Sequence, residues 1–468
     1  MGIKTLVLFL LISYGLLHCD DLIQQDTLTK DFDTFNKLVN SEKSYENTIT
    51  LLSDISNVNK PIFDEYAKKI DFDETLAVSQ CLNASAKELV DLNSDCIAVG
   101  LTLKKALTLT PLELNTVILK TEDKYPLFAK ELKIINSPIP FTRIISSSKD
   151  IIYDLYLGST NEFLFNKLNY RLPLKTIEKI KDDERFGKFL TLAISNVKLN
   201  FLQGTFLEFD DSTYNHNISF LLGLNRVLNK KYDEKTIDYF KNALSKATLQ
   251  EEKDKTLFWL YMLTKDDAYL TPIKESKSLN IYTFHINNLQ KKDFKNSEDF
   301  KVLKYDFLKD CSNGRKVLIN SFAKTLSNFN ESLISPDFNL GLMQIDLIKT
   351  KSIAKSNNLE VSNEELLIPK TNILYFSYIL NELETEFYHP LTLFYAYIYD
   401  ANSLNSRLDF DLFKTKNMYE PYLSLELLSS EKSKDFIMNY LIYNKIINKK
   451  ELTVEKFFKN LFQPSDFH

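Results

Sequence analysis

The sequence predicts an all-α fold with more than one domain. Only 9 glycines and 12 prolines occur among its 468 residues, so the residues that build tight hairpin turns and Gly-rich phosphate loops are scarce. Short apolar segments with helical spacing follow one another from about residue 29 to residue 273, and we find no sustained period-2 alternation, the pattern of half-buried strands. At about 150 residues per domain, a chain of this length predicts two or three domains.

The first predicted element is an export signal. Lys4 precedes an apolar run from Thr5 to Leu17, which has the length of a signal-peptide core and is too short to span a bilayer comfortably. We therefore predict a signal peptide over 1–19, a periplasmic location and no transmembrane helix in the mature chain. Residues 17–19 resemble a lipoprotein box, although a histidine before Cys19 fits it poorly, so a lipid anchor on Cys19 and a soluble mature form both stay open.

The second predicted element is an irregular α-superhelix over 20–270. In the segment 233–247 four apolar residues share one helical face and polar residues fill the other, and the segments 218–228 and 251–263 have the same character. Helical hairpins stacked in series form a solenoid, but no strict repeat period is present. Residues 271–304 are richer in Ser, Asn, Lys and Asp, which predicts a linker region before a last domain over 305–468.

Cys81 and Cys96 are compatible with a disulfide. In an oxidising compartment a bridge over this short loop would stabilise the fold by about 3 kcal/mol, because it restricts the unfolded chain. Two ordinary buried thiols are the alternative, and the sequence leaves both open. Cys311 is expected to be a free thiol.

Composition and charge exclude several classes of function. The formal net charge is -5, and Lys alternates with Asp and Glu along the chain, so no basic patch is visible and no nucleic-acid partner is expected. None of the five histidines lies at metal-ligand spacing from another histidine or a cysteine, and no Gly-x-Ser-x-Gly nucleophile elbow occurs. We therefore expect no metal and no cofactor.

Short motifs follow one another in the C-terminal part of the chain. In order, they are Ser327-Asn328-Phe329-Asn330 with Ser335-Pro336, Gly341-Leu342-Met343-Gln344-Ile345, Pro369-Lys370-Thr371-Asn372-Ile373, Ala396-Tyr397, and Tyr419-Glu420-Pro421-Tyr422 with Ser433-Lys434-Asp435-Phe436. This order resembles the signature of the soluble lytic transglycosylases of the bacterial cell wall, in which Glu-Ser-x-Phe-Asn-Pro leads through Ser-Pro to Gly-Leu-Met-Gln.

The resemblance implies a lysozyme-like helical domain over 305–468 that grips the glycan strands of peptidoglycan. The family cleaves the linkage between N-acetylmuramic acid and N-acetylglucosamine and closes a 1,6-anhydro ring, and one carboxyl serves as both acid and base. On the same grounds, the substrate-binding residues of this chain would be Ser327, Ser335, Met343, Gln344 and Tyr397. Met343 and Tyr397 are also compatible with core positions, and Gln344 with a polar surface position.

Leu326 stands where the family has its catalytic glutamate. A leucine has no exchangeable proton, and general acid–base catalysis is typically worth about 10²- to 10⁴-fold, so most activity should be lost. Ile398 and Lys432 depart from the family pattern too, at an Asn and a Glu position respectively. Glu331 and Glu431 stay open as displaced acids, although Glu331 is expected to be a solvated loop residue past the helix end.

These observations predict an exported homologue that binds peptidoglycan glycan strands with little or no cleavage. Another periplasmic wall-processing protein is a second expected partner. Two alternatives stay open: an active lytic transglycosylase with a displaced acid, and a helical scaffold that binds a protein partner without touching glycan.

Overall fold

The structure is a computed structural model, and it describes residues 21–70, 72–207, 209, 215–289, 300–357, 359–399, 419, 422–427 and 431–459. The predicted signal peptide and Cys19 lie outside these residues. In the described part of the chain, regular structure is helical apart from two isolated bridges, Ile334 with Leu340 and Leu340 with Ile345. The predicted all-α class is therefore confirmed. None of the described helices is both long and apolar enough to cross a membrane.

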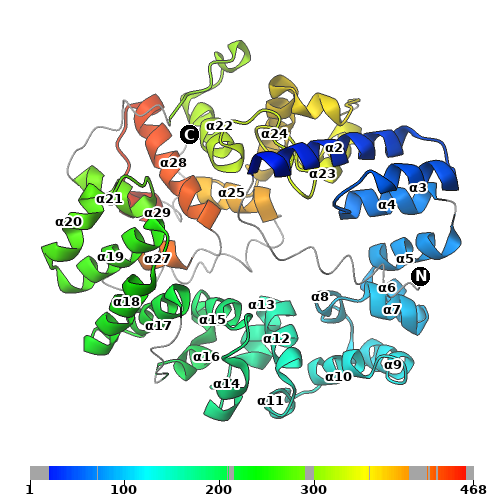
Figure 1. Cartoon of the computed structure of the whole chain (residues 1–468), viewed down its shortest axis with the longest axis horizontal. Coiled ribbons are helices and arrows are strands. Elements are labelled where there is room, and N and C mark those ends of the chain that lie inside the picture. The colour runs from blue at the N-terminus through cyan, green and yellow to red at the C-terminus, as the bar shows by residue number, and fades with distance from the viewer. Residues whose placement is uncertain are drawn as a thin grey trace. The chain divides into compact units, whose positions relative to one another are not determined.

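The chain divides into two compact units (Figure 1), each built from segments that are distant in sequence. The first unit combines Met1–Leu101 with Phe322–Glu382, and the second combines Thr102–Ser321 with Leu383–His468. The predicted boundaries at 270 and 305 remain a prediction, because these units group segments by contact and not by order in the chain.

The helices and helical turns before residue 206 are α2 (Asp21–Asn40), α3 (Tyr45–Ser53), α4 (Lys60–Lys69), α5 (Asp73–Asn83), α6 (Ala86–Asp91), α7 (Ser94–Gly100), α8 (Leu103–Ala106), α9 (Pro111–Thr121), α10 (Pro126–Ile135), α11 (Phe141–Ile145), α12 (Lys149–Gly158), α13 (Asn161–Phe163), η1 (Leu164–Leu168), α14 (Leu174–Ile180), α15 (Phe186–Ile194), η2 (Val197–Leu199) and α16 (Asn200–Thr205). Those after it are α17 (His216–Leu228), α18 (Glu234–Lys246), α19 (Gln250–Thr264), α20 (Asp267–Glu275), α21 (Ile281–Leu289), η3 (Asp306–Leu308), α22 (Asn313–Ser327), α23 (Leu347–Ser356), η4 (Glu364–Leu367), α24 (Pro369–Leu383), α25 (Pro390–Tyr399), α27 (Tyr422–Glu426), α28 (Glu431–Asn448) and α29 (Val454–Lys459).

The three helices predicted around residues 218–263 are present as α17, α18 and α19. The side chain of Asp233 caps α18 by accepting a hydrogen bond from the amide of Thr236. The apolar face expected from the sequence consists of Ile237, Phe240, Leu244 and Ala247, of which Phe240 is buried and the other three are half-buried. The buried face is centred on Thr236, Tyr239, Phe240 and Ala243. Gly223 of α17 makes room for this face, because a Cβ there would lie 3.0 Å from the Phe240 ring.

Part of the predicted linker region is ordered helix. The end of α20 and all of α21 fall within 271–304, and Tyr282, Phe284 and Ile286 of α21 are buried. Aromatic side chains in this segment therefore belong to a packed core, although its overall composition is polar.

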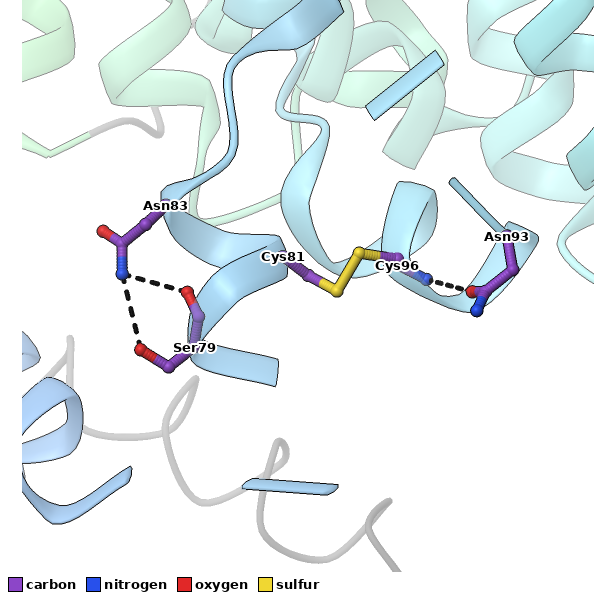
Figure 2. Close-up of a disulfide and its surroundings, with 5 residues drawn as sticks. All are labelled: Ser79, Cys81, Asn83, Asn93 and Cys96. Carbon is purple, nitrogen blue, oxygen red and sulfur yellow. Dashed lines mark hydrogen bonds between the residues drawn. A yellow bond between two sulfur atoms is a disulfide. The ribbon is translucent and has the colours of Figure 1, made fainter. Parts of the chain in front are cut away.

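Cys81 of α5 and Cys96 of α7 form a disulfide, with 5.2 Å between their Cα atoms (Figure 2). The amide of Cys96 donates to the side chain of Asn93 at 2.9 Å, which caps α7. Gly100 at the end of α7 faces α5 so closely that a Cβ would lie 2.1 Å from the carbonyl oxygen of Cys81. The cross-link and the close helix contact therefore occur at the same place. Cys311 is a free thiol.

Replacing Cys81 and Cys96 together by serine is expected to lower the free energy of unfolding by about 3 kcal/mol, because the unfolded chain regains its freedom. Chemical denaturation of the oxidised protein measures the loss. Cys311→Ser removes no cross-link and is the control, with an expected change within about 0.5 kcal/mol. A double variant as stable as the parent would contradict a stabilising disulfide.

Candidate functional site

Leu326 lies in the last turn of α22, and its side chain is half-buried. The helix ends at two residues of left-handed conformation, Asn328 and Phe329. The amide of Phe329 donates to the carbonyl of Ala323 at 3.3 Å, and that of Asn328 donates to the carbonyl of Lys324 at 3.2 Å. The position expected for a catalytic acid is therefore at a helix C-terminus, directly before a sharp change of chain direction.

Backbone strain is concentrated in the loop that follows. Of the seven non-glycine residues with positive φ in the described part of the chain, four lie in this loop: Asn328, Phe329, Phe338 and Gln344. Such a conformation costs about 1–2 kcal/mol for an ordinary side chain and persists only where the surroundings impose it. Since strain of this kind gathers at functional sites, the loop 328–346 is the candidate site of the first unit.

The centre of this loop is held by one buried amide. Asn372 of α24 is fully buried, and its Nδ2 donates to the carbonyls of Leu340 at 2.8 Å and Leu366 at 2.7 Å. Its Oδ1 accepts from the amide of Met343 at 2.8 Å. Gly341 has a φ of 69°, and a Cβ there would lie 2.6 Å from the Asn372 Nδ2 atom. Only glycine allows the turn to approach the amide this closely.

The side chain of Gln344 turns back into the same loop. Its Nε2 donates to the carbonyls of Leu333 at 3.0 Å and Gly341 at 2.9 Å. The pair of backbone hydrogen bonds between Leu340 and Ile345 closes the turn next to it. Both amide hydrogens of Gln344 are therefore engaged within the protein, which leaves its Oε1 atom as the group that can accept from a ligand.

The N-terminal helices support this loop inside the first unit. The ring of Phe338 packs on Phe32 and Phe35 of α2, with centroid distances of 5.2 and 5.3 Å. Nδ2 of Asn59, the residue that caps α4, donates to the carbonyl of Pro336 at 2.8 Å. All these contacts lie within the first unit. The strained loop is therefore held by α2 and by the residue that caps α4, although both come nearly 300 residues earlier in the sequence.

The predicted substrate-binding residues have different surroundings. Ser327 is buried, with its hydroxyl bonded to the carbonyl of Ala323 at 2.9 Å. The hydroxyl of Ser335 accepts from the amide of Asn339 at 2.9 Å. Met343 is completely buried, which agrees with the core alternative.

The structure brings Ser327, Ser335, Met343 and Gln344 together in the first unit. Tyr397 is buried in α25 of the second unit.

The two glutamates considered as displaced acids differ in position. Glu331 is exposed in the loop past the end of α22, as expected from the sequence. Glu431 is the first residue of α28, and its side chain lies outside the described part of the structure. Lys432, at the family's glutamate position, is exposed on α28.

A buried ion pair in the second unit was not predicted. Lys434 of α28 and Glu426 of α27 are 3.2 Å apart, with side chains 6% and 2% exposed. Trp259 of α19 and Tyr282 of α21 donate to the same carboxylate oxygen at 2.8 and 2.6 Å. Burial alone would raise the pKa of Glu426, but the charge of Lys434 and these hydrogen bonds outweigh it and lower the pKa. The pair therefore ties the C-terminal helices to α19 and α21.

Sequence reasoning missed the roles of Asn372 and Glu426. Asn372 was noted within a motif, but its three partners lie in other segments. For Glu426 a signal was available: it interrupts the apolar run 422–428, where a charged residue needs a buried partner. Among the described residues, no group of three or more His, Cys, Asp or Glu side chains is arranged to hold a metal ion.

Comparison with known proteins gives one family match. Residues 309–417 match the family model described as Transglycosylase SLT domain. No curated protein matches the sequence.

Two of the similar solved structures are lytic transglycosylases. An inactive mutant of lytic transglycosylase Slt from Pseudomonas aeruginosa has 10% identity and a TM-score of 0.27, over 95% of this chain and 78% of that one. The 70 kDa soluble lytic transglycosylase Slt70 from Escherichia coli has 12% identity and a TM-score of 0.28, over 92% and 73%. Both TM-scores are below 0.5, so no feature of this chain is inferred from these two structures.

Gly341→Ala is expected to lower the free energy of unfolding by about 2–4 kcal/mol, because it strains a positive φ and displaces Asn372 from its partners. Gly314→Ala is the matched control. Gly314 lies near the start of α22 in open space, and alanine there should leave stability unchanged or raise it by up to about 1 kcal/mol. Thermal and chemical unfolding of both variants provide the measurement, and equal effects would refute the role assigned to the turn.

Lys434→Met is expected to cost about 3–5 kcal/mol, because it leaves the carboxylate of Glu426 buried without its ion-pair partner. Lys432→Met, two residues earlier on the same helix and exposed, should change stability by no more than about 0.5 kcal/mol. Denaturation midpoints at pH 7 compare the two. If both variants lose the same stability, the ion pair is not the source of the effect.

Proposed function

We propose that this chain is an exported lytic-transglycosylase homologue that binds glycan strands of peptidoglycan and cleaves them little or not at all. The premise is the match of residues 309–417 to the transglycosylase SLT domain. The periplasm is its proposed location, and a wall-processing protein is a proposed second partner.

The observation that carries this proposal is Leu326 at the C-terminal end of α22. A single carboxyl at this place would have to protonate the leaving oxygen and then accept a proton from the internal hydroxyl. The leucine side chain can do neither. Glu331 is exposed and lies past the helix end, not at the position of Leu326.

The scaffold around the missing acid is intact. Gly341, Asn372 and the strained loop retain a conformation that is costly to maintain, which argues for a retained binding role. The Oε1 atom of Gln344 and the half-buried Ser335 are the polar groups proposed to contact sugar hydroxyl and acetamido groups there. Tyr397 is proposed as a further contact on the second unit.

Leu326→Glu is expected to restore weak cleavage. The C-terminus of a helix carries partial negative charge, which disfavours an ionised carboxylate and raises the pKa of a glutamate placed there. A raised pKa suits a general acid at neutral pH. Purified mature protein is incubated with murein sacculi, and 1,6-anhydro-muropeptides are quantified by mass spectrometry.

Leu326→Gln is the matched control, since it has the same size and polarity without the titrating proton. The proposal predicts anhydro products from the Glu variant and none from the Gln variant or the parent chain. Products formed by the parent at an enzymatic rate would overturn it and favour the displaced-acid alternative. Glu331→Gln and Glu431→Gln would then identify the acid.

A further inference from the structure

An open surface pocket of about 510 Å³, referred to below as the cavity, is lined by residues of α9, α10 and α11 and of the segments next to them, all in the second unit. Figure 1 shows where these three helices lie in the chain. The size of the cavity is typical of sites for small ligands. The cavity is far in sequence from the loop that carries the proposed glycan contacts. Its lining includes one guanidinium, two side-chain amides and three aliphatic side chains, which are Arg143, Asn115, Asn136, Ile118, Leu119 and Pro138.

Arg143 supplies the cation. Its guanidinium makes one hydrogen bond to protein among the described residues, from Nη1 to the carbonyl of Lys133 at 3.1 Å, and no described carboxylate pairs with it. That bond anchors one end of the guanidinium and leaves its other N–H donors for a ligand. A planar fork of donors matches a carboxylate better than it matches a sugar hydroxyl.

The other charges in the cavity neutralise each other. Lys133 and Glu122 form an ion pair at 2.6 Å. The lining therefore carries one net positive charge, that of Arg143. A ligand with a single carboxylate complements this charge, whereas a polyanion does not.

Two amides provide a donor and an acceptor side by side. Nδ2 of Asn136 donates to Oδ1 of Asn115 at 2.8 Å and to the carbonyl of Pro111 at 3.3 Å. These bonds fix the orientation of both side chains. They leave Nδ2 of Asn115 as a donor and Oδ1 of Asn136 as an acceptor, which is the pair of groups that one peptide bond requires.

Part of the cavity lining is aliphatic. Ile118, Leu119 and Pro138 form this part, and the side chain of Leu119 is 70% exposed in the absence of a ligand. Leu112, two turns earlier on α9 and outside the lining, is 76% exposed. Covering such a surface with a small aliphatic side chain would remove apolar area from water.

We propose that this cavity binds the free carboxylate end of a short peptide whose terminal residues have small aliphatic side chains. Arg143 holds the carboxylate, Asn115 and Asn136 hold the last peptide bond, and Ile118, Leu119 and Pro138 contact the side chains. We assign the peptide to the peptide stems of peptidoglycan, an assignment that rests on the proposed function. The chain then contacts the wall through two chemically different sites.

The test measures the binding of acetyl-lysyl-D-alanyl-D-alanine to the full mature chain by calorimetry, beside the same peptide with a C-terminal amide. The acid should bind at least 10-fold more tightly than the amide. Arg143→Gln should abolish this difference in affinity. Arg143→Lys keeps the charge but lacks the planar pair of N–H donors, so it should retain part of the difference. Lys130→Gln, an exposed cation on α10 outside the lining, should bind like the parent.

Equal affinities of the acid and the amide, or no binding of either, would overturn the proposal. Unfolding curves of both Arg143 variants identify any loss of peptide binding that is due to misfolding. Tighter binding of an all-L peptide acid would overturn the assignment to wall peptides in favour of a protein chain end. Binding to glycan strands freed of peptide distinguishes the two proposals. If the protein binds these strands but not the peptide acid, the peptide site is rejected and the glycan proposal stands. If it binds the peptide acid but not the strands, the glycan proposal is rejected and the peptide site stands.

Discussion

The side-chain amide of Asn372 is the interaction on which the candidate site depends. It is fully buried and satisfies two carbonyls and one amide from two segments of the first unit, the loop 328–346 and η4. A buried amide that lost these partners would pay its whole desolvation penalty, so the turn at Gly341 and the amide require each other. The direction of the Gln344 side chain and the packing of Phe338 follow from the path that this turn imposes on the loop.

Periodicity in the sequence was sufficient to predict the helices. The segments around 218–263 carry their apolar residues at helical spacing, and α17, α18 and α19 are found there. These predictions succeed because they depend on local spacing, which the sequence states directly.

Contacts between distant segments could not be predicted in the same way. The sequence did not indicate that the amide hydrogens of Gln344 bond carbonyls at Leu333 and Gly341. The pair of Glu426 and Lys434 depends on Trp259 and Tyr282, which come more than 140 residues earlier in the chain. Of the apolar face expected on α18, only Phe240 is fully buried, because packing against neighbouring helices and not hydropathy decides which residues are covered.

The proposed function separates binding from chemistry. The central claim is that this chain binds glycan strands without cutting them. The most direct test is to incubate the protein with peptide-free glycan strands and to measure both the retention of the strands and their length. The account predicts that strands are retained by the protein and that their length distribution does not change. Strands that shorten and gain 1,6-anhydro ends, or strands that are not retained at all, would contradict it.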